Sequence, residues 1–399
     1  MRKLNVLFIV QGDGRGHMTQ ALAIQRILLD AGHRLCGILL GRESEQPVPN
    51  FFASKVSAPI VRYQSFAFFN NKANTAIDPL ASLIGNVRRL PTIIRSLLTI
   101  RREIAKRKPD VVVNFLEPLA GICYLLFRPN VPLACVANQY LFLHPDYEFP
   151  PGRNLDRFFI KLYARLTSIG AARRMALSLR PRPDRPSGCA TIPPLLRSEI
   201  LARQQSRSEP ADRPSTQPSA ICESSPAYGR GTGDGGEGAE RPFFLIYLLK
   251  SGLRAQIIDW HKRRPEIELH CFSDQLQESD AVRYDETLTF HRISEQKFLD
   301  LMVHCRGMVA TAGYQTLCEA MYFDKPILIV PVGNHFEQAC NAHEAELLGA
   351  GVAATHFDLD RFLEYIPKHQ GGAASFRAWV DEAPRRVLNV IESIAESCE

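Results

Sequence analysis

Two glycine-containing turns carry the residues of this sequence that are best suited to chemistry. Residues 311–313 (TAG) stand between the apolar segment 308–310 and a predicted helix over 314–323. Small residues let a ligand approach the backbone closely. A helix N-terminus adds unpaired N–H groups and the positive end of a dipole. Thr311, Ala312 and Gly313 are therefore predicted to form an anion site suited to phosphate.

The predicted helix after Gly313 carries further polar groups. Glu319 lies on the same side as Gln315 and Thr316 by helical spacing. The apolar segment 327–330 predicts a buried parallel strand, and the loop 331–338 would lie at its carboxyl end, where open α/β sheets bind ligands. That loop brings the polar pair Glu337 and Gln338 to the same edge.

The second glycine-containing turn, residues 11–17 (QGDGRGH), follows the apolar segment 4–10. It ends at His17, where a helix is predicted to begin. A histidine facing a cleft at this point has a suitable pKa to take a proton from a hydroxyl group. Two alternatives stay open: the glycines only shape the turn, or His17 only bonds the loop or a phosphate. Asp13 is the nearest carboxylate, and it is equally a turn-forming residue.

Both turns begin a strand–turn–helix–strand pattern, which predicts two α/β domains. The first domain is expected over 1–202, with strands at 4–10, 35–40, 111–115 and 131–136 and a helix over 154–175. The second is expected over 242–399, with strands at 243–248, 268–272 and 288–291. Residues 203–241 are rich in Ser, Pro and Gly and predict a flexible linker or insertion. Two polar residues, Glu117 and Asn138, follow first-domain strands. Together with Asp13 they are candidate contacts for an acceptor substrate.

The segment 307–341 resembles the donor-binding motif of GT-B glycosyltransferases. The similar families are the lipid II-forming N-acetylglucosaminyltransferases and the UDP-glycosyltransferases. In the latter the motif reads His-x-Gly-x-Asn-Ser-x-x-Glu, with Asp-Gln further on. Thr311 stands here in place of the histidine, and Glu337 in place of the aspartate. The glycine turn that ends in His17 resembles the first turn of the same families.

This resemblance implies the GT-B fold: two Rossmann-like domains facing across a cleft, with the last helix crossing back to the first domain. It implies that a nucleotide sugar, with UDP as the default, binds as a substrate, and that neither a metal nor another cofactor is needed. It implies that Glu319 holds the ribose and that Glu337 and Gln338 hold the transferred sugar. Other donor contacts are expected at Gly14, Gly16, Ser251, Gly252, Ile293, Gly313, Gln315 and Thr316.

The composition agrees with an ordinary globular protein. The 399 residues are 45% hydrophobic and 23% charged, and the net charge of +6 does not require a nucleic-acid partner. The ten cysteines contain no C-x-x-C pair, which favours free thiols in the cytoplasm over a zinc site or disulfides. No apolar run is long enough to predict a membrane span.

Residues 86–108 predict an amphipathic helix with a strongly basic polar side. The simpler interpretation is a solvated surface helix. The alternative is a peripheral contact with an anionic membrane, which would suit a lipid-linked acceptor.

We expect inverting transfer of a sugar to a hydroxyl group, with His17 as the general base. Two other functions suit the same architecture: a nucleotide-sugar 2-epimerase, and a non-catalytic nucleotide-sugar or lipid-binding protein. An NAD-dependent dehydrogenase is disfavoured, because no acidic residue ends the second strand.

Overall fold

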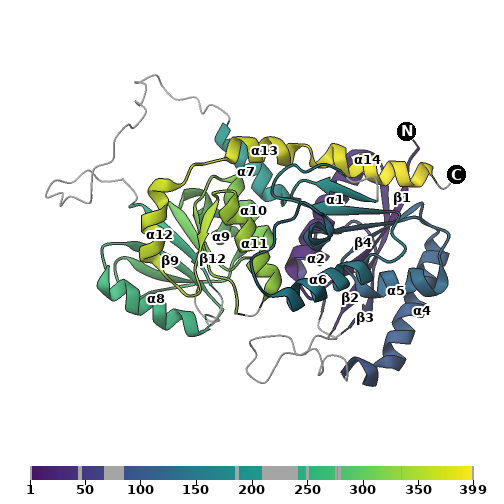
Figure 1. The fold of residues 1–399 in the computed structure, drawn as a ribbon, viewed down its shortest axis with the longest axis horizontal. Helices are drawn as coiled ribbons and strands as arrows, with labels where there is room; N and C mark the ends of the chain where they lie inside the picture. Colours follow the sequence, from purple (N-terminus) through teal and green to yellow (C-terminus); the bar gives the residue numbers. More distant parts are fainter. Residues whose placement is uncertain are drawn as a thin grey trace.

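The structure is a computed structural model that describes residues 2–43, 47–66, 85–184, 188–208, 241–248, 251–274, 276, 280–333 and 335–397. Within these ranges the chain forms two α/β units that lie side by side (Figure 1). Most of the predicted linker, residues 209–240, lies outside the described ranges.

The strands of the first unit are β1 (Asn5–Gln11), β2 (Arg34–Arg42), β3 (Ile60–Gln64), β4 (Val111–Phe115), β5 (Leu133–Ala137), β6 (Arg173–Leu177) and β7 (Cys189–Ile192). Its helices are α1 (Arg15–Asp30), α2 (Asn50–Ala53), α4 (Leu90–Arg107), α5 (Pro118–Phe127), the 3-10 helix η1 (Asn138–Leu143), α6 (Asn154–Thr167) and α7 (Ser198–Ser208).

The strands of the second unit are β8 (Phe243–Tyr247), β9 (Glu268–Ser273), β10 (Ala281–Arg283), β11 (Leu288–Arg292), β12 (Gly307–Ala310), β13 (Ile327–Ile329) and β14 (Gly351–Ala353). Its helices are α8 (Ser251–Arg263), α9 (Glu295–His304), α10 (Tyr314–Tyr322), α11 (Phe336–Leu347), α12 (Leu359–Tyr365) and the 3-10 helix η2 (Ile366–Lys368). The chain ends in α13 (Ala373–Asp381) and α14 (Ala383–Glu396).

The two sheets have nearly the same topology. In the described chain the first sheet has the order β3-β2-β1-β4-β5-β6-β7, with all strands parallel. The second has the order β10-β11-β9-β8-β12-β13-β14, and β10 alone is antiparallel to its neighbour. The order reverses at β1/β4 and at β8/β12. Ligands of open α/β sheets bind beyond the carboxyl ends of the strands at such a point.

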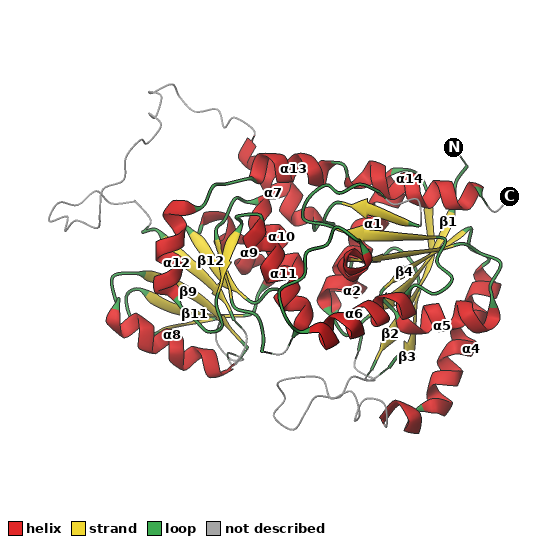
Figure 2. Cartoon of the chain, viewed as in Figure 1, coloured by secondary structure: helices red, strands yellow, loops and turns green. Residues whose placement is uncertain are grey.

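Helices cover both faces of the first sheet (Figure 2). On one face, buried residues of α1 and α14, including Ile24 and Ile391, pack on the strands. On the other face, α4 and α5 contribute Ile100 and Leu119 to a second core. The strand residues alternate between the two cores because successive side chains point to opposite faces. This layering leaves the carboxyl ends of the strands free to build a site.

The last helices join the two units, as the GT-B resemblance implies. In Figure 1, α13 and α14 run along one edge of the molecule from the second unit to the first. Trp379 of α13 donates its indole N–H to the backbone oxygen of Ser178, at 3.0 Å. Val387 and Ile391 of α14 are fully buried against the first unit. The crossing-back helix therefore fixes the first unit to the second.

Three predicted boundaries are wrong. The linker expected from residue 203 begins later, because residues 203–208 belong to α7. The helix expected over 154–175 ends at Thr167, because Gly170 has a φ of +75° that a helix cannot contain, and residues 173–177 form β6 instead. The loop expected over 331–338 ends earlier, since α11 begins at Phe336. His335 caps this helix by accepting a hydrogen bond from the Gln338 N–H. Glu337 and Gln338 therefore lie in a first helical turn.

The free thiols expected from the cysteine pattern are present in the described ranges, while the cytoplasmic location stays a prediction. The eight cysteines found there are free, and six of them are buried.

Candidate active site: a cavity between the two sheets

A cavity of about 360 Å³ lies between the two units, beyond the carboxyl ends of β1, β8 and β12. Ten of the predicted site residues line it: Gly14, Gly16, His17, Asn138, Ile293, Gly313, Gln315, Thr316, Glu319 and Glu337. These residues come from both units, so the site is complete only when the two face each other.

The first-unit side of the cavity is the N-terminus of α1. Gly14 is the N-cap, and a Cβ atom built on Gly14 or Gly16 would meet no other atom within 4 Å. The turn is therefore open to a ligand. Asp13 supports it from outside the cavity, because its carboxylate accepts a hydrogen bond from the Glu43 N–H at 3.0 Å. Asp13 thus shapes the turn in this structure.

His17 is half-buried in the first turn of α1. Its Nδ1 lies 3.4 Å from Gln20 Oε1, one turn further along the helix. In the tautomer that donates this hydrogen bond, Nε2 is the basic nitrogen. Burial lowers the pKa of His17, while the negative charge of Glu337 and the Gln20 contact oppose this shift. The balance favours a neutral imidazole at pH 7, as a general base requires.

The second-unit side of the cavity is the N-terminus of α10. Gly313 is the N-cap and provides no side chain to bond the first N–H groups of the helix. The first helical bond runs from the Leu317 N–H to the Gly313 oxygen, at 3.1 Å. The N–H groups of residues 314–316 therefore have no intrahelical acceptor. Asn341 holds the turn in place by donating to the Ala312 oxygen, at 3.0 Å. Ala312 is fully buried, whereas Gly313 and Thr316 line the cavity.

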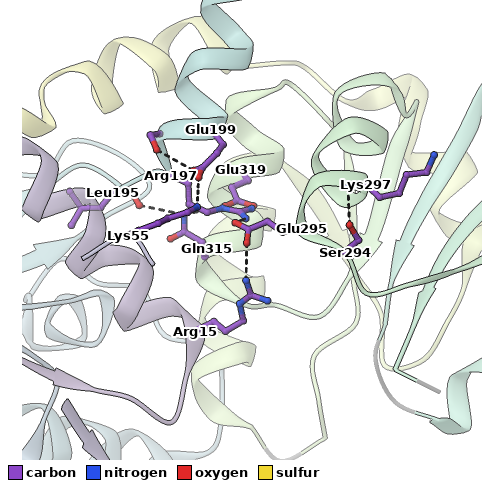
Figure 3. A network of polar contacts seen from close by, with 11 residues as sticks. Arg15, Lys55, Leu195, Arg197, Glu199, Ser294, Glu295, Lys297, Gln315 and Glu319 are labelled. Carbon is purple, nitrogen blue, oxygen red and sulfur yellow. Dashed lines mark hydrogen bonds and ion pairs between the residues drawn. The ribbon is translucent and has the colours of Figure 1, made fainter. Parts of the chain in front are cut away.

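Glu319 lies deeper in the cavity wall and is 2% exposed. Arg197 approaches it with two parallel hydrogen bonds, Nε to Oε1 at 2.7 Å and Nη2 to Oε2 at 2.6 Å. Gln315 adds a bond from Nε2 to Oε1, at 3.3 Å. Figure 3 shows Arg197 between Glu319 and Glu295, with its third nitrogen 2.7 Å from Glu295 Oε1. Arg15 of the first turn reaches the other oxygen of Glu295, at 3.2 Å.

This network joins the two units through alternating charges. Arg15 and Arg197 come from the first unit, and Glu295 and Glu319 come from the second. Among the described residues, Glu319 Oε2 accepts one hydrogen bond, from Arg197 Nη2. A carboxylate oxygen has two lone pairs, so Oε2 can accept a second hydrogen bond. Glu319 is thus fixed in position and can still accept a hydrogen bond from a ligand.

A second contact between the units lies near His17. Asn138, at the carboxyl end of β5, donates from Nδ2 to Glu337 Oε1 at 3.2 Å. Both residues line the cavity. Gln338 does not line it among the described residues, because its Oε1 accepts the Val332 N–H at 2.8 Å and supports the loop.

Ser251 and Gly252 form the first turn of α8. Their backbone lies after β8, at the point where the strand order of the second sheet reverses. Ile293 lines the cavity and is 38% exposed. It stands after β11, one residue before Ser294, which caps α9.

Glu117 is fully buried, and it is absent from the cavity lining in the described chain. Its Oε1 accepts the Ser65 hydroxyl at 2.6 Å and the Leu119 N–H at 3.2 Å. Its Oε2 has no hydrogen-bond partner among the described residues. Burial raises the pKa of Glu117 to about 7, against the lowering effect of these bonds. In this structure Glu117 caps α5 beneath the surface.

Sequence reasoning missed Arg15, Gln20, Arg197 and Glu295 as site residues. Arg197 and Glu295 follow β7 and β11, at the carboxyl ends of two further strands. The rule that ligands gather at these ends would have drawn attention to both. Gln20 had a signal in its spacing, since it stands three residues after His17 on one helix.

The fold and the site together define a class. Two Rossmann-like units that face each other across a ligand cavity, with a helix returning to the first unit, are the GT-B architecture of glycosyltransferases. Residues 4–211 and 237–368 match the family model described as glycosyl transferase family 1. The chain therefore belongs to this family and is a glycosyltransferase.

Solved structures of the same fold cover nearly the whole chain. The spinosyn forosaminyltransferase SpnP is 14% identical with a TM-score of 0.58, over 99% of this chain and 100% of that one. Phytolacca americana UGT2, complexed with UDP-2-fluoroglucose and pterostilbene, is 13% identical with a TM-score of 0.57, over 99% of both chains. MurG of Acinetobacter baumannii is 14% identical with a TM-score of 0.53, over 98% of this chain and 100% of that one. A search of curated proteins finds no match.

The described residues hold no group of three or more His, Cys, Asp or Glu side chains arranged to bind a metal ion. Nor do the helices within the described ranges include one with the length and apolar character needed to cross a bilayer.

Proposed function

We propose that this glycosyltransferase takes a sugar from a nucleotide sugar and transfers it, with inversion, to a hydroxyl group. The observation that carries the proposal is the position of three helix N-termini. Those of α8 and α10 flank the strand-order reversal of the second sheet, and that of α1 presents His17 from the first unit.

The nucleoside diphosphate occupies the second-unit side in this proposal. The free N–H groups at the start of α10, together with Gly313 and Thr316, accept the phosphate charge. The first turn of α8, with Ser251 and Gly252, meets the same diphosphate from the neighbouring strand. The free lone pair of Glu319 Oε2 accepts a ribose hydroxyl. Ile293 supports the base, for which UDP is the default from the family resemblance.

The transferred sugar extends from the diphosphate toward the first unit. Glu337 and Asn138 lie on that side and offer hydrogen-bond partners for its hydroxyl groups. Gln338 contributes indirectly by holding the loop before α11.

The chemical step is a single displacement. The acceptor oxygen bonds to the anomeric carbon while the bond from that carbon to the diphosphate oxygen breaks. His17 Nε2 takes the acceptor proton, and the helix N-termini stabilise the negative charge that develops on the diphosphate. Attack from the face opposite the leaving group inverts the anomeric centre.

The acceptor in this proposal is a hydroxyl compound. A lipid-linked acceptor would be consistent with contact between the enzyme and a membrane surface. A cytoplasmic location with peripheral membrane contact remains our prediction from the sequence.

The test is an assay of nucleoside diphosphate release from UDP-, GDP- and TDP-sugars, with and without hydroxyl acceptors. His17→Ala should lose turnover by about 100-fold or more while its donor affinity stays within a few fold. His304→Ala, which changes an exposed histidine of α9, is the matched control. Turnover that survives in His17→Ala would disprove the base assignment. Conversion of UDP-GlcNAc alone to its 2-epimer would favour the epimerase alternative.

A further inference from the structure

Helix α6 exposes an unusual amount of apolar surface. Of its fourteen residues, only Ala164 and Thr167 are buried. Leu155, Phe158, Phe159, Leu162 and Leu166 are 75%, 57%, 55%, 38% and 43% exposed, respectively. Their spacing of three or four residues places them on one side of the helix. A stripe of this kind is normally buried against a partner.

Positive charges run beside this apolar stripe. Arg157, Lys161 and Arg165 follow each other at intervals of one turn. The only acidic residue of the helix, Asp156, pairs with Arg153 at 2.8 Å. Partial burial and the neighbouring charges of Arg157 and Arg165 lower the pKa of Lys161. The charges of α6 therefore repel one another and would gain from an anionic partner.

The same character continues on the two adjoining helices. Helix α5 packs against α6 and exposes Leu125 and Leu126, at 53% and 60%. Helix α4 packs against α5 and exposes Leu90, Ile94 and Leu98. Figure 1 shows α6, α5 and α4 following one another along one edge of the first unit. We call this the α4–α6 surface.

The α4–α6 surface adjoins the sugar end of the cavity. Phe149, just before α6, stacks on Phe336, the first residue of α11, with ring centroids 6.2 Å apart. The guanidinium of Arg157 lies 4.7 Å from the Phe149 ring centre. The next residue of α11 is Glu337, which lines the cavity. Arg157 of the α4–α6 surface is therefore linked through Phe149 and Phe336 to a residue that lines the cavity.

We propose that the α4–α6 surface binds an anionic lipid bilayer, with the apolar side chains of α6 inserted among the acyl chains and its basic side chains at the headgroups. An amphipathic helix with Phe and Leu on one side and Lys and Arg beside them fits that interface. A second copy of the chain fits less well. A symmetric dimer would place the same basic residues of the two copies against each other.

Cosedimentation with vesicles tests the inference without any donor or acceptor, so its failure would leave the proposed transfer reaction intact. The full chain is mixed with phosphatidylcholine vesicles that contain or lack phosphatidylglycerol. We expect the wild type to bind only the anionic vesicles and to be released by salt. Arg157→Gln/Lys161→Gln/Arg165→Gln should weaken binding by about 100-fold, since each charge contributes near an anionic surface.

The apolar contribution is tested by Phe158→Ser/Phe159→Ser, which should weaken binding by about tenfold or more. Tyr284→Ser, an exposed aromatic residue of the second unit, is the matched control and should bind as the wild type does. Circular dichroism and thermal unfolding verify that each variant is folded. Failure of the wild type to bind anionic vesicles would overturn the proposal, as would unchanged binding by the folded variants. A dimer detected by light scattering that the Phe158/Phe159 variant abolishes, without vesicle binding, would assign the surface to a second copy.

Discussion

Arg197 donates a hydrogen bond to each carboxylate oxygen of Glu319 across the boundary between the two units, at 2.7 and 2.6 Å. The side chain of Glu319 is 2% exposed and that of Arg197 is 15% exposed. Neither charge can be solvated fully by water in this position. The pair therefore positions the carboxylate that we assign to the ribose, and it also fastens the connection before α7 to helix α10.

Replacement of Arg197 should destabilise the protein strongly. Arg197→Ala leaves Glu319 buried without its cation, and breaking such a pair costs about 3–5 kcal/mol. Arg203→Ala is a matched control on α7. It breaks an ion pair with Asp300, whose side chain is 46% exposed, and should cost about 1 kcal/mol or less. Urea denaturation measures both values. Equal losses in the two variants would show that the Arg197–Glu319 pair has no special role.

The pH dependence of turnover should report His17. Activity requires the neutral imidazole, so kcat/KM should fall as the pH drops through a pKa that burial places below the usual 6.5. The negative charge of Glu337 raises this pKa. Glu337→Gln should therefore move the acidic limb to lower pH. Glu364→Gln, on the exposed surface of α12, should leave the limb in place. A shift to higher pH in Glu337→Gln would contradict the electrostatic coupling.

The buried carboxyl of Glu117 should make stability depend on pH. Its pKa is about 7 in the folded protein against 4.5 for an ordinary glutamate, because burial disfavours the charge. The folded state holds the proton more tightly, so the contribution of Glu117 to stability falls as the pH rises from about 4.5 to 7.

The matched variant is Glu117→Gln, which keeps the shape and does not titrate. Between these pH values the variant should gain about 3 kcal/mol of unfolding free energy relative to the wild type. Glu286→Gln, an exposed residue, is the control. A difference between Glu117→Gln and wild type that is constant with pH would show that Glu117 titrates normally.

The sequence predicted the parts of the fold that local patterns determine. The strand, turn and helix around Gly313 depend on neighbouring residues, since an apolar segment, small residues and helical periodicity follow one another within 307–323. The same is true of the turn before His17. The end of α6 was missed, since the helical pattern continues past Gly170, whose positive φ becomes visible only in the folded chain.

The partners of the site residues were harder to predict. Arg197 and Glu319 are 122 residues apart in sequence, and no local pattern joins them. The burial of Glu117 was also missed. The side chain of a residue that follows a strand can face the cleft or cap the next helix, and the local sequence does not distinguish the two. The sequence did not show that the apolar side of α6 is exposed rather than buried in the core. Its apolar stripe has the same spacing in both cases.

The most direct test of the account is calorimetric titration of nucleoside diphosphates into the wild type and Thr316→Asp. Thr316 lies at the start of α10, where we place the phosphates, so a carboxylate there should repel them. We predict that the wild type binds at least one of UDP, GDP and TDP, and that Thr316→Asp weakens this binding by about tenfold or more. Thr355→Asp, at an exposed position outside the cavity, should bind as the wild type does. Equal affinity in Thr316→Asp and wild type, or no binding of any of the three nucleotides, would contradict the proposed donor site.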